Sequence, residues 1–169
     1  MRCVLVGMPG AGKSSVGRQL ARRLNVAFWD SDAVIEQRIG CTIREFFDQQ
    51  GEAAFRDLEA EVIRELCTGE DCVLATGGGS VLRPENRAVL HANGTVMYLR
   101  ASPDQLYRRL KNDTKRPLLQ VADPLQALKD LYAVRDPLYR ETAHFVMETG
   151  RPSLAMLVNK ILMQIDMMA

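Results

Sequence analysis

A glycine-rich segment near the N-terminus is the feature that most constrains the fold of this chain. Residues 7–14 read Gly-Met-Pro-Gly-Ala-Gly-Lys-Ser, which matches the pattern GxxxxGK[ST]. A short apolar run at 3–6 precedes the segment, and a helical apolar pattern over 12–24 follows it. Glycines let the backbone wrap around phosphate oxygens, and the amides of Gly10 to Ser14 supply donors at a helix N-terminus. This setting favours a phosphate-binding loop over a glycine-rich turn with a solvated lysine.

The last two residues of this loop indicate which phosphates it binds. Lys13 can neutralise β and γ phosphates, and the Ser14 hydroxyl can bind magnesium. We therefore predict that the chain binds a nucleoside triphosphate with Mg²⁺.

A GTPase switch is another use of such a loop, so we searched for its other motifs. Asn159–Leu162 begins like the guanine-reading NKxD motif but has leucine where aspartate is needed. Asp48–Gly51 fits DxxG, but it follows a predicted helix rather than a strand. We interpret both matches as chance.

The rest of the chain alternates short apolar runs with amphipathic segments. We expect strands at 3–6, 27–29, 72–75, 95–99 and 145–147, and helices at 12–24, 42–47, 51–67, from 102 and from 153. This alternation predicts an α/β fold of the P-loop NTPase type, in which helices flank a five-stranded, mostly parallel sheet in three layers. We expect one domain over 1–169, with the segments after the first three strands meeting at one cleft.

Composition excludes several functions. The 169 residues carry a formal charge of +1, which gives no general attraction to nucleic acid or membranes. The four cysteines form no CxxC pair and the two histidines stand far apart, so we expect neither a zinc site nor disulfides. The apolar stretch at the N-terminus is too short for a signal peptide or a membrane span. We expect a cytoplasmic protein that acts as a monomer on a small-molecule substrate.

Two carboxylates follow the second predicted strand, in the sequence Asp30-Ser31-Asp32. One of them could help to hold the magnesium shell, and the other could accept a proton from the hydroxyl that receives the phosphoryl group. Alternatively, Ser31 or Asp32 merely caps the next helix. The sequence leaves these two interpretations open.

A second glycine-rich turn, 76–80, follows the third strand and could present backbone amides to a ligand. The same residues would also be typical of an ordinary flexible turn. Arginines are scattered along the chain, and composition does not distinguish a binding arginine from a surface one. Arg56, for example, can pair with Glu52 and Glu59 at helical spacing.

Six segments, in order, resemble the shikimate kinase family along nearly the whole chain. They are GMPGAGKSSVGRQLA at 7–21, DSD at 30–32, GEAAFRDLE at 51–59, TGGGSV at 76–81, KRPLL at 115–119 and RDPLY at 135–139. The resemblance implies transfer of the γ-phosphoryl group of ATP to the 3-hydroxyl of shikimate, a step toward chorismate and the aromatic amino acids. A gluconate or nucleoside monophosphate kinase remains an alternative.

The resemblance also implies roles for individual residues. Asp32 would bind the shikimate hydroxyls and orient the attacking oxygen, and Asp30 would reach magnesium through water. Arg56, Arg135 and the amide of Gly78 or Gly79 would hold the carboxylate of the acceptor. The implied nucleotide-binding residues are Gly10, Ala11, Gly12, Lys13, Ser14, Ser15, Arg109, Arg116 and Arg151.

Lys13, Asp32 and Arg116 are the predicted catalytic residues. The resemblance places a substrate-binding region at about 32–60, with Phe47 and Phe55 on its apolar side, and a closing lid at about 111–123. The third strand ends in Ala75-Thr76, without the aspartate that ligates magnesium in many P-loop enzymes, so Ser14 would be the main protein ligand.

Overall fold

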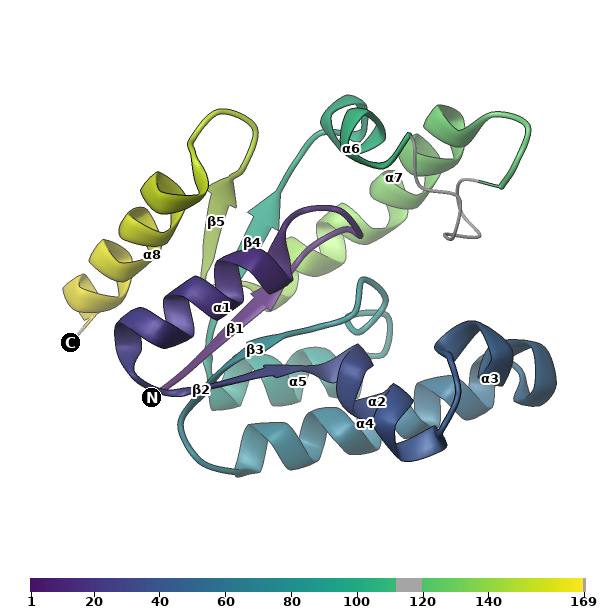
Figure 1. The fold of residues 1–169 in the computed structure, drawn as a ribbon, viewed down its shortest axis with the longest axis horizontal. Helices are drawn as coiled ribbons and strands as arrows, with labels where there is room; N and C mark the ends of the chain where they lie inside the picture. Colours follow the sequence, from purple (N-terminus) through teal and green to yellow (C-terminus); the bar gives the residue numbers. More distant parts are fainter. Residues whose placement is uncertain (112–119, 169) are drawn as a thin grey trace.

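The fold is a parallel sheet with helices on both faces, seen in a computed structural model that describes residues 1–111 and 120–168 (Figure 1). The five strands lie in the order β2-β3-β1-β4-β5, and every neighbouring pair is parallel. Their bounds are β1 (Arg2–Val6), β2 (Ala27–Asp30), β3 (Cys72–Ala75), β4 (Thr95–Arg100) and β5 (Phe145–Glu148). Each expected strand is confirmed to within one residue at either end.

The helices form the outer layers and one projecting end. On one face of the sheet lie α1 (Lys13–Leu24) and α8 (Leu154–Met168). The other face is covered by α4 (Glu52–Thr68), α5 (Pro84–Asn93) and α7 (Pro124–Thr142). Beyond the end of β2 lie α2 (Ser31–Ile39) and α3 (Ile43–Gln50), and α6 (Pro103–Leu110) follows β4.

Three of the predicted helices, α3, α6 and α8, begin at a residue whose side chain caps the helix. The Ser102 hydroxyl accepts a hydrogen bond from the Gln105 amide, and the Gln105 side chain accepts one from the Ser102 amide, which completes a capping box. Thr42 and Ser153 accept in the same way at the starts of α3 and α8. The sequence reasoning missed α5 and α7. In α7 a proline, Pro137, lies inside the helix, a position that proline disfavours.

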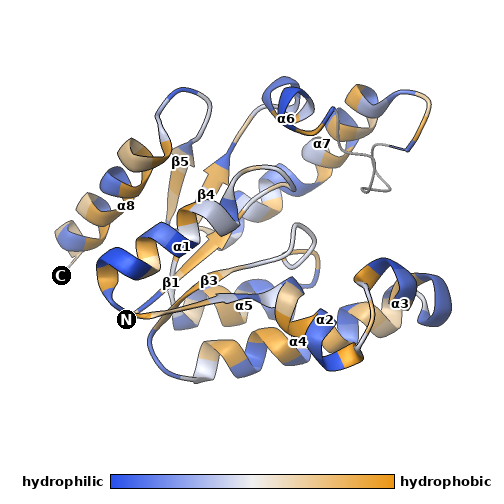
Figure 2. Ribbon diagram, viewed as in Figure 1, coloured by the Kyte–Doolittle hydropathy of each residue, from blue (hydrophilic) through white to orange (hydrophobic). Residues whose placement is uncertain are grey.

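The central strands are buried in the way that is typical of a parallel sheet. All residues of β3, and residues 3–6 of β1, are fully buried and apolar, as expected of strands covered on both faces (Figure 2). None of the described helices is long and apolar enough to cross a membrane.

The strand register brings three loops to one edge of the sheet. Ala75 at the end of β3 pairs with Leu5 of β1 on one side and with Asp30 of β2 on the other. The chain therefore leaves β1, β2 and β3 at the same level, and the expectation of a shared cleft is confirmed by a cavity that these loops line together.

Two stacked histidines connect α5 to the segment that precedes β5. The rings of His91, in α5, and His144, before β5, lie 4.0 Å apart between centroids at an interplanar angle of 13°. His144 Nδ1 accepts a hydrogen bond of 2.9 Å from the Val96 amide of β4, so a proton at this nitrogen would break a contact within the sheet region. Burial, and then the neighbouring His91, lower the pKa of His144.

His144 should make the protein less stable in mild acid. The unfolded chain takes up a proton near pH 6.5 while the folded chain keeps His144 neutral, so stability falls as the pH drops from about 6.5 toward the lower folded pKa. In His144→Asn the amide oxygen can replace Nδ1 as acceptor without titrating. Urea unfolding at pH 7.5 and 5.5 should show a smaller loss of stability for the variant than for wild type. Equal losses would contradict this assignment.

Candidate active site

The loop between β1 and α1 has the geometry of an anion-binding site. Gly10 and Gly12 have φ of 85° and 93°, a left-handed backbone that favours glycine. Gly12 is the N-cap of α1 and has no side-chain hydrogen bond to the first-turn amides, which leaves them available at the positive end of the helix. Lys13 Nζ donates to the carbonyls of Gly7, at 2.6 Å, and Met8, at 3.0 Å. The ammonium group is thereby held across the loop.

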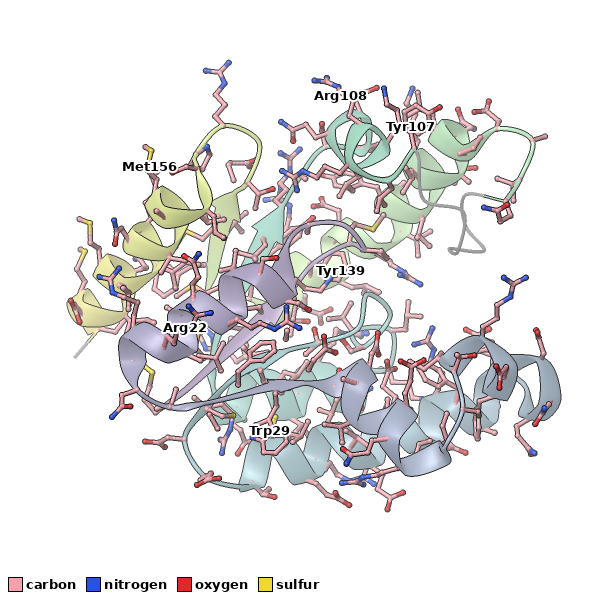
Figure 3. All side chains as sticks on the ribbon, viewed as in Figure 1. Arg22, Trp29, Tyr107, Arg108, Tyr139 and Met156 are labelled. Atoms are coloured by element: carbon pink, nitrogen blue, oxygen red, sulfur yellow. The ribbon has the colours of Figure 1, made fainter. Side chains whose placement is uncertain are left out.

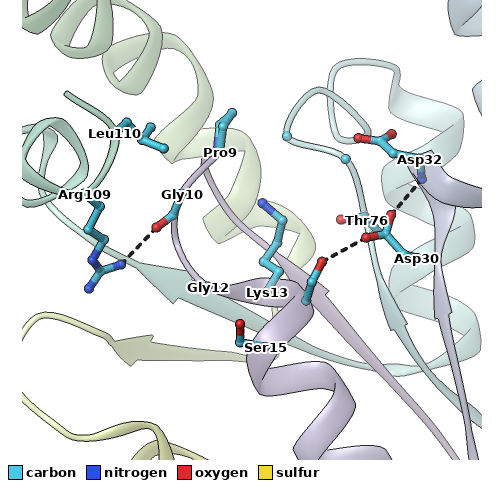
Figure 4. A pocket seen from close by; sticks show the side chains of 13 residues that line it. Pro9, Gly10, Gly12, Lys13, Ser15, Asp30, Asp32, Thr76, Arg109 and Leu110 are labelled. Atoms are coloured by element: carbon cyan, nitrogen blue, oxygen red, sulfur yellow. Dashed lines mark hydrogen bonds between the residues drawn. The ribbon is translucent and has the colours of Figure 1, made fainter. Parts of the chain in front are cut away.

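Asp30 links this loop to the end of β2. Its Oδ2 accepts a hydrogen bond of 2.8 Å from the Ser14 hydroxyl, and its Oδ1 accepts from the amides of Asp32 and Ala33 (Figure 4). Asp30 is therefore the cap of α2, and the alternative that Ser31 or Asp32 caps this helix is wrong. Ser31 is buried instead and accepts from the Gly77 amide at 3.2 Å.

Asp32 lies in the cavity that the three loops enclose. The cavity has a volume of about 420 Å³. Its lining consists of Pro9, Gly10, Gly12, Lys13, Ser14, Ser15, Asp30, Asp32, Thr76, Gly77, Gly78, Arg109 and Leu110. Burial, followed by the charges of Asp30 and Glu59, raises the pKa of Asp32 to about 6, although Lys13 acts in the opposite direction. A carboxyl group with this pKa can accept a proton near neutral pH.

Three consecutive glycines leave room for three charged side chains. A Cβ on Gly77 would lie 2.5 Å from Asp32 Oδ1, and one on Gly79 would lie 2.5 Å from Arg56 Nη1. On Gly78 it would lie 3.1 Å from Arg135 Nη1 and closer still to Pro9. The glycine turn thus brings together Asp32 and two arginines that stand far apart in the sequence.

Arg56 is held from several sides. Its Nη1 donates to Glu59 Oε1 at 2.9 Å, and its Nε lies 3.6 Å from Glu52, so both pairings that helical spacing allowed are present. The guanidinium carbon lies 5.9 Å and 5.1 Å from the ring centroids of Phe47 and Phe55. These two phenylalanines, whose centroids are 4.9 Å apart, pack against the guanidinium group of Arg56.

The two arginines retain unused hydrogen-bond donors. Within the described part of the chain, the buried Nε atoms of Arg56 and Arg135 have no hydrogen-bond partner. A buried donor without a hydrogen-bond partner costs about 1–3 kcal/mol, which the 3.6 Å ion pair with Glu52 offsets in part for Arg56 Nε. Glu59 is nearly fully buried next to them, and burial raises its pKa against the pull of Arg56 and Arg135.

The remaining residues that were predicted to bind the nucleotide lie in different places. Arg109 joins the cavity lining and donates to the carbonyls of Gly10, at 3.1 Å, and Thr149, at 2.9 Å. Ala11 is buried within the loop, and Arg151 lines a second cavity of about 490 Å³ with Gly150 and Pro152. Arg116 and most of the predicted lid lie outside the described residues.

Sequence reasoning overlooked two residues that shape this site. Thr76, where a metal-binding aspartate was missing, is buried and its hydroxyl donates to the Leu5 carbonyl at 2.9 Å. Tyr139, in the segment 135–139 noted for Arg135, donates from its hydroxyl to the Gly78 carbonyl at 2.6 Å. Its presence four residues after Arg135, on the same helix face, was the available signal.

Comparison with known proteins agrees with this geometry. The chain matches the family model for shikimate kinase over residues 9–166. It is 57% identical over 164 residues to the shikimate kinase of Burkholderia pseudomallei (strain 1710b), covering 97% of this chain and 89% of that relative. The solved structure of shikimate kinase from Acinetobacter baumannii in complex with shikimate is similar with a TM-score of 0.92 and 45% identity, covering 97% and 92% of the two chains.

A likeness to another kinase bears on the alternative acceptors. A gluconokinase structure from Sinorhizobium meliloti 1021 is similar with a TM-score of 0.59 at 19% identity, covering 99% of this chain and 93% of that one. Identity this low shows a shared P-loop kinase fold alone, so the alternative of a gluconate or nucleoside monophosphate kinase is not favoured. By its family model and its relatives, the chain belongs to the shikimate kinase family of ATP-dependent phosphotransferases.

Proposed function

We propose that this protein transfers the γ-phosphoryl group of ATP to the 3-hydroxyl of shikimate, yielding shikimate 3-phosphate and ADP. The observation that carries the proposal is the position of the glycine turn 77–79. It lies between the phosphate-binding loop, the carboxylate of Asp32 and the paired guanidinium groups of Arg56 and Arg135. An acceptor with both hydroxyl and carboxylate groups matches these charges, and the relative from Acinetobacter baumannii binds shikimate.

The proposed roles follow from charge and distance. The first-turn amides of α1 and the Lys13 ammonium bind the β and γ phosphates, and Arg109 holds the loop from the side of the nucleotide. Ser14 Oγ and Asp30 Oδ2, 2.8 Å apart, are the hard oxygen atoms that Mg²⁺ prefers, so this pair suits the metal, with Asp30 acting directly or through water. Bound there, Mg²⁺ neutralises charge on the phosphate oxygens.

Asp32 acts on the acceptor. Its carboxylate accepts a hydrogen bond from the 3-hydroxyl, orients the oxygen toward the γ phosphate and takes up the proton as the new bond forms. Arg56 and Arg135 bind the acceptor carboxylate, which fixes the ring relative to Asp32. Region 32–60 supplies the substrate side of the cavity, and we further propose that Arg116 and the 111–123 lid close over the phosphates.

We also propose that the chain works as one domain and a monomer in the cytoplasm, where ATP is supplied. All four cysteines are free thiols, which is compatible with a reducing compartment.

Acceptor specificity tests the whole proposal. With Mg²⁺ and ATP, ADP release should be fast with shikimate and near background with gluconate, AMP or water as acceptor. Preference for gluconate or AMP would point to another small-molecule kinase, and equal slow release with every acceptor would indicate a nucleotide-dependent switch.

Asp32→Asn should lower kcat by about 10² or more while making the protein more stable at pH 8. The pKa of Asp32 is about 6 in the folded chain and 3.8 ordinarily, so between these two pH values the folded chain keeps a proton that the unfolded chain loses. This contribution to stability is present below pH 3.8 and is lost as the pH rises through 6. An asparagine avoids the buried charge at pH 8.

Steady-state kinetics and urea unfolding at pH 5 and pH 8 would measure both effects. For wild type, kcat/KM should fall below about pH 6 as Asp32 takes up its proton. A variant that keeps its kcat and loses stability at pH 8 would show that Asp32 supports the fold only.

Arg56→Ala and Arg135→Ala should each weaken shikimate binding by about ten- to a hundredfold, because each guanidinium makes charge-assisted bonds that alanine cannot replace. ATP affinity should barely change. The two effects should not add, since both arginines bind one carboxylate. Arg64→Ala, an exposed arginine on the same helix as Arg56, is the matched control and should bind normally.

A shikimate analogue with an uncharged amide in place of the carboxylate completes this test by calorimetry. Wild type should bind it poorly, and both alanine variants should lose far less affinity for it than for shikimate. Equal losses for acid and amide would show that these arginines do not recognise the carboxylate.

A further inference from the structure

The carbonyl groups of the glycine turn are all held by hydrogen bonds. The Gly77 carbonyl accepts from the Ser80 amide, at 3.1 Å, and from the Ser80 hydroxyl, at 2.6 Å. The Gly78 carbonyl accepts from the Tyr139 hydroxyl at 2.6 Å, and the Gly79 carbonyl accepts from the Leu82 amide at 3.1 Å. The turn thus has a defined set of peptide orientations despite its three glycines.

These bonds determine where the amides point. In a planar trans peptide the carbonyl and the following N–H point in opposite directions. The Gly78 carbonyl points to Tyr139, so the Gly79 N–H must point away from Tyr139. Tyr139 itself is fully buried, and Figure 3 labels it among the side chains in the middle of the view. The turn borders the cavity, which Gly77 and Gly78 line, and a Cβ at Gly79 would lie 2.5 Å from Arg56 Nη1.

Helix α7 delivers two groups to this turn. Arg135 and Tyr139 are four residues apart and therefore lie on one helix face. The Arg135 guanidinium approaches Gly78 from one side, while the Tyr139 hydroxyl holds the carbonyl of the same glycine. The Tyr139 ring packs on Tyr98, with 5.0 Å between centroids, which leaves the hydroxyl little freedom to move. The Tyr139 hydroxyl thereby ties the helix that carries Arg135 to the turn.

We propose that Tyr139 is a positioning residue for recognition of the acceptor carboxylate. By holding the Gly78 carbonyl, its hydroxyl keeps the Gly79 amide turned toward the carboxylate that Arg56 and Arg135 bind. Tyr139 acts through the turn and does not touch the acceptor. The inference rests on the proposed function, and it assigns a binding effect to a residue that would otherwise be a core tyrosine with a satisfied hydroxyl.

Tyr139→Phe removes only the hydroxyl and should raise the KM and Kd for shikimate about tenfold, the usual effect of losing one hydrogen bond to a charged group. The KM for ATP should not change, and kcat at saturating shikimate should stay within about twofold of wild type. Binding of the uncharged amide analogue should barely weaken, because a misplaced amide matters most for a charged acceptor.

Tyr98→Phe is the matched control. Tyr98 is also fully buried, belongs to the same ring pair, and loses a bond to a charged group, since its hydroxyl donates to Asp136 Oδ1 at 2.7 Å. Tyr98→Phe should lose at least as much stability in urea unfolding as Tyr139→Phe, but only Tyr139→Phe should lose shikimate affinity. If both variants lose affinity equally, or neither does, the hydroxyl of Tyr139 has only a structural role and the proposal is wrong.

A second pair of variants covers the possibility that phenylalanine at this position does not fold. Position 139 can carry 4-aminophenylalanine, which restores a donor to the Gly78 carbonyl, or 4-fluorophenylalanine, which fills the space without donating. Shikimate affinity should be near wild type with the first and about tenfold weaker with the second. Equal affinities would overturn the proposal.

Calorimetry on the wild-type protein separates this inference from the proposed function. Wild type that does not bind shikimate would refute the proposed function itself. Wild type that binds shikimate, together with a Tyr139→Phe variant that binds it equally well, would refute only the role of Tyr139.

Discussion

The Asp30 carboxylate organises the site, because its two oxygens serve two different elements. One oxygen caps α2 and thereby sets the direction in which Asp32 leaves β2. The other accepts from Ser14 and aligns the start of α1 with the end of β2. This arrangement is possible only because parallel register brings β1, β3 and β2 to a common edge. Asp30 therefore caps α2 with one oxygen and keeps the other beside Ser14, where we propose that magnesium binds.

Several charged groups lie at the side of the cavity that we propose binds the acceptor. Burial there makes it costly to keep these groups charged. Burial raises the pKa of both Asp32 and Glu59, and the Nε atoms of Arg56 and Arg135 are buried without a hydrogen-bond partner within the described residues. Each of these groups would be easier to accommodate in a more hydrated site. Their arrangement is consistent with a protein that sacrifices stability to have its charges in place before the substrate binds. Apolar packing of Phe47 and Phe55 around Arg56 helps to keep that charge in position.

Local patterns predicted the strands and the phosphate-binding loop, because both depend on contiguous residues such as 3–6 and 7–14. They did not predict α7, whose internal Pro137 obscures the helix, or the identity of the cap of α2. Arg56 and Arg135 could be chosen only through resemblance to a family, since their proximity to Gly78 and Gly79 arises from contacts between distant segments. The contact of Tyr139 with the glycine turn could not be predicted for the same reason, because its partner, Gly78, is 61 positions away in the chain.

The glycine turn has a consequence for attempts to redesign this enzyme. At residues 77–79 every possible Cβ would meet a charged side chain within 3.1 Å, and the three side chains come from three different segments of the chain. Alanine in this turn would therefore displace the charged ends of these side chains rather than the backbone, and should impair acceptor binding more than folding. New acceptor preferences would have to arise in the surrounding side chains, which makes this turn a fixed template around which specificity can evolve.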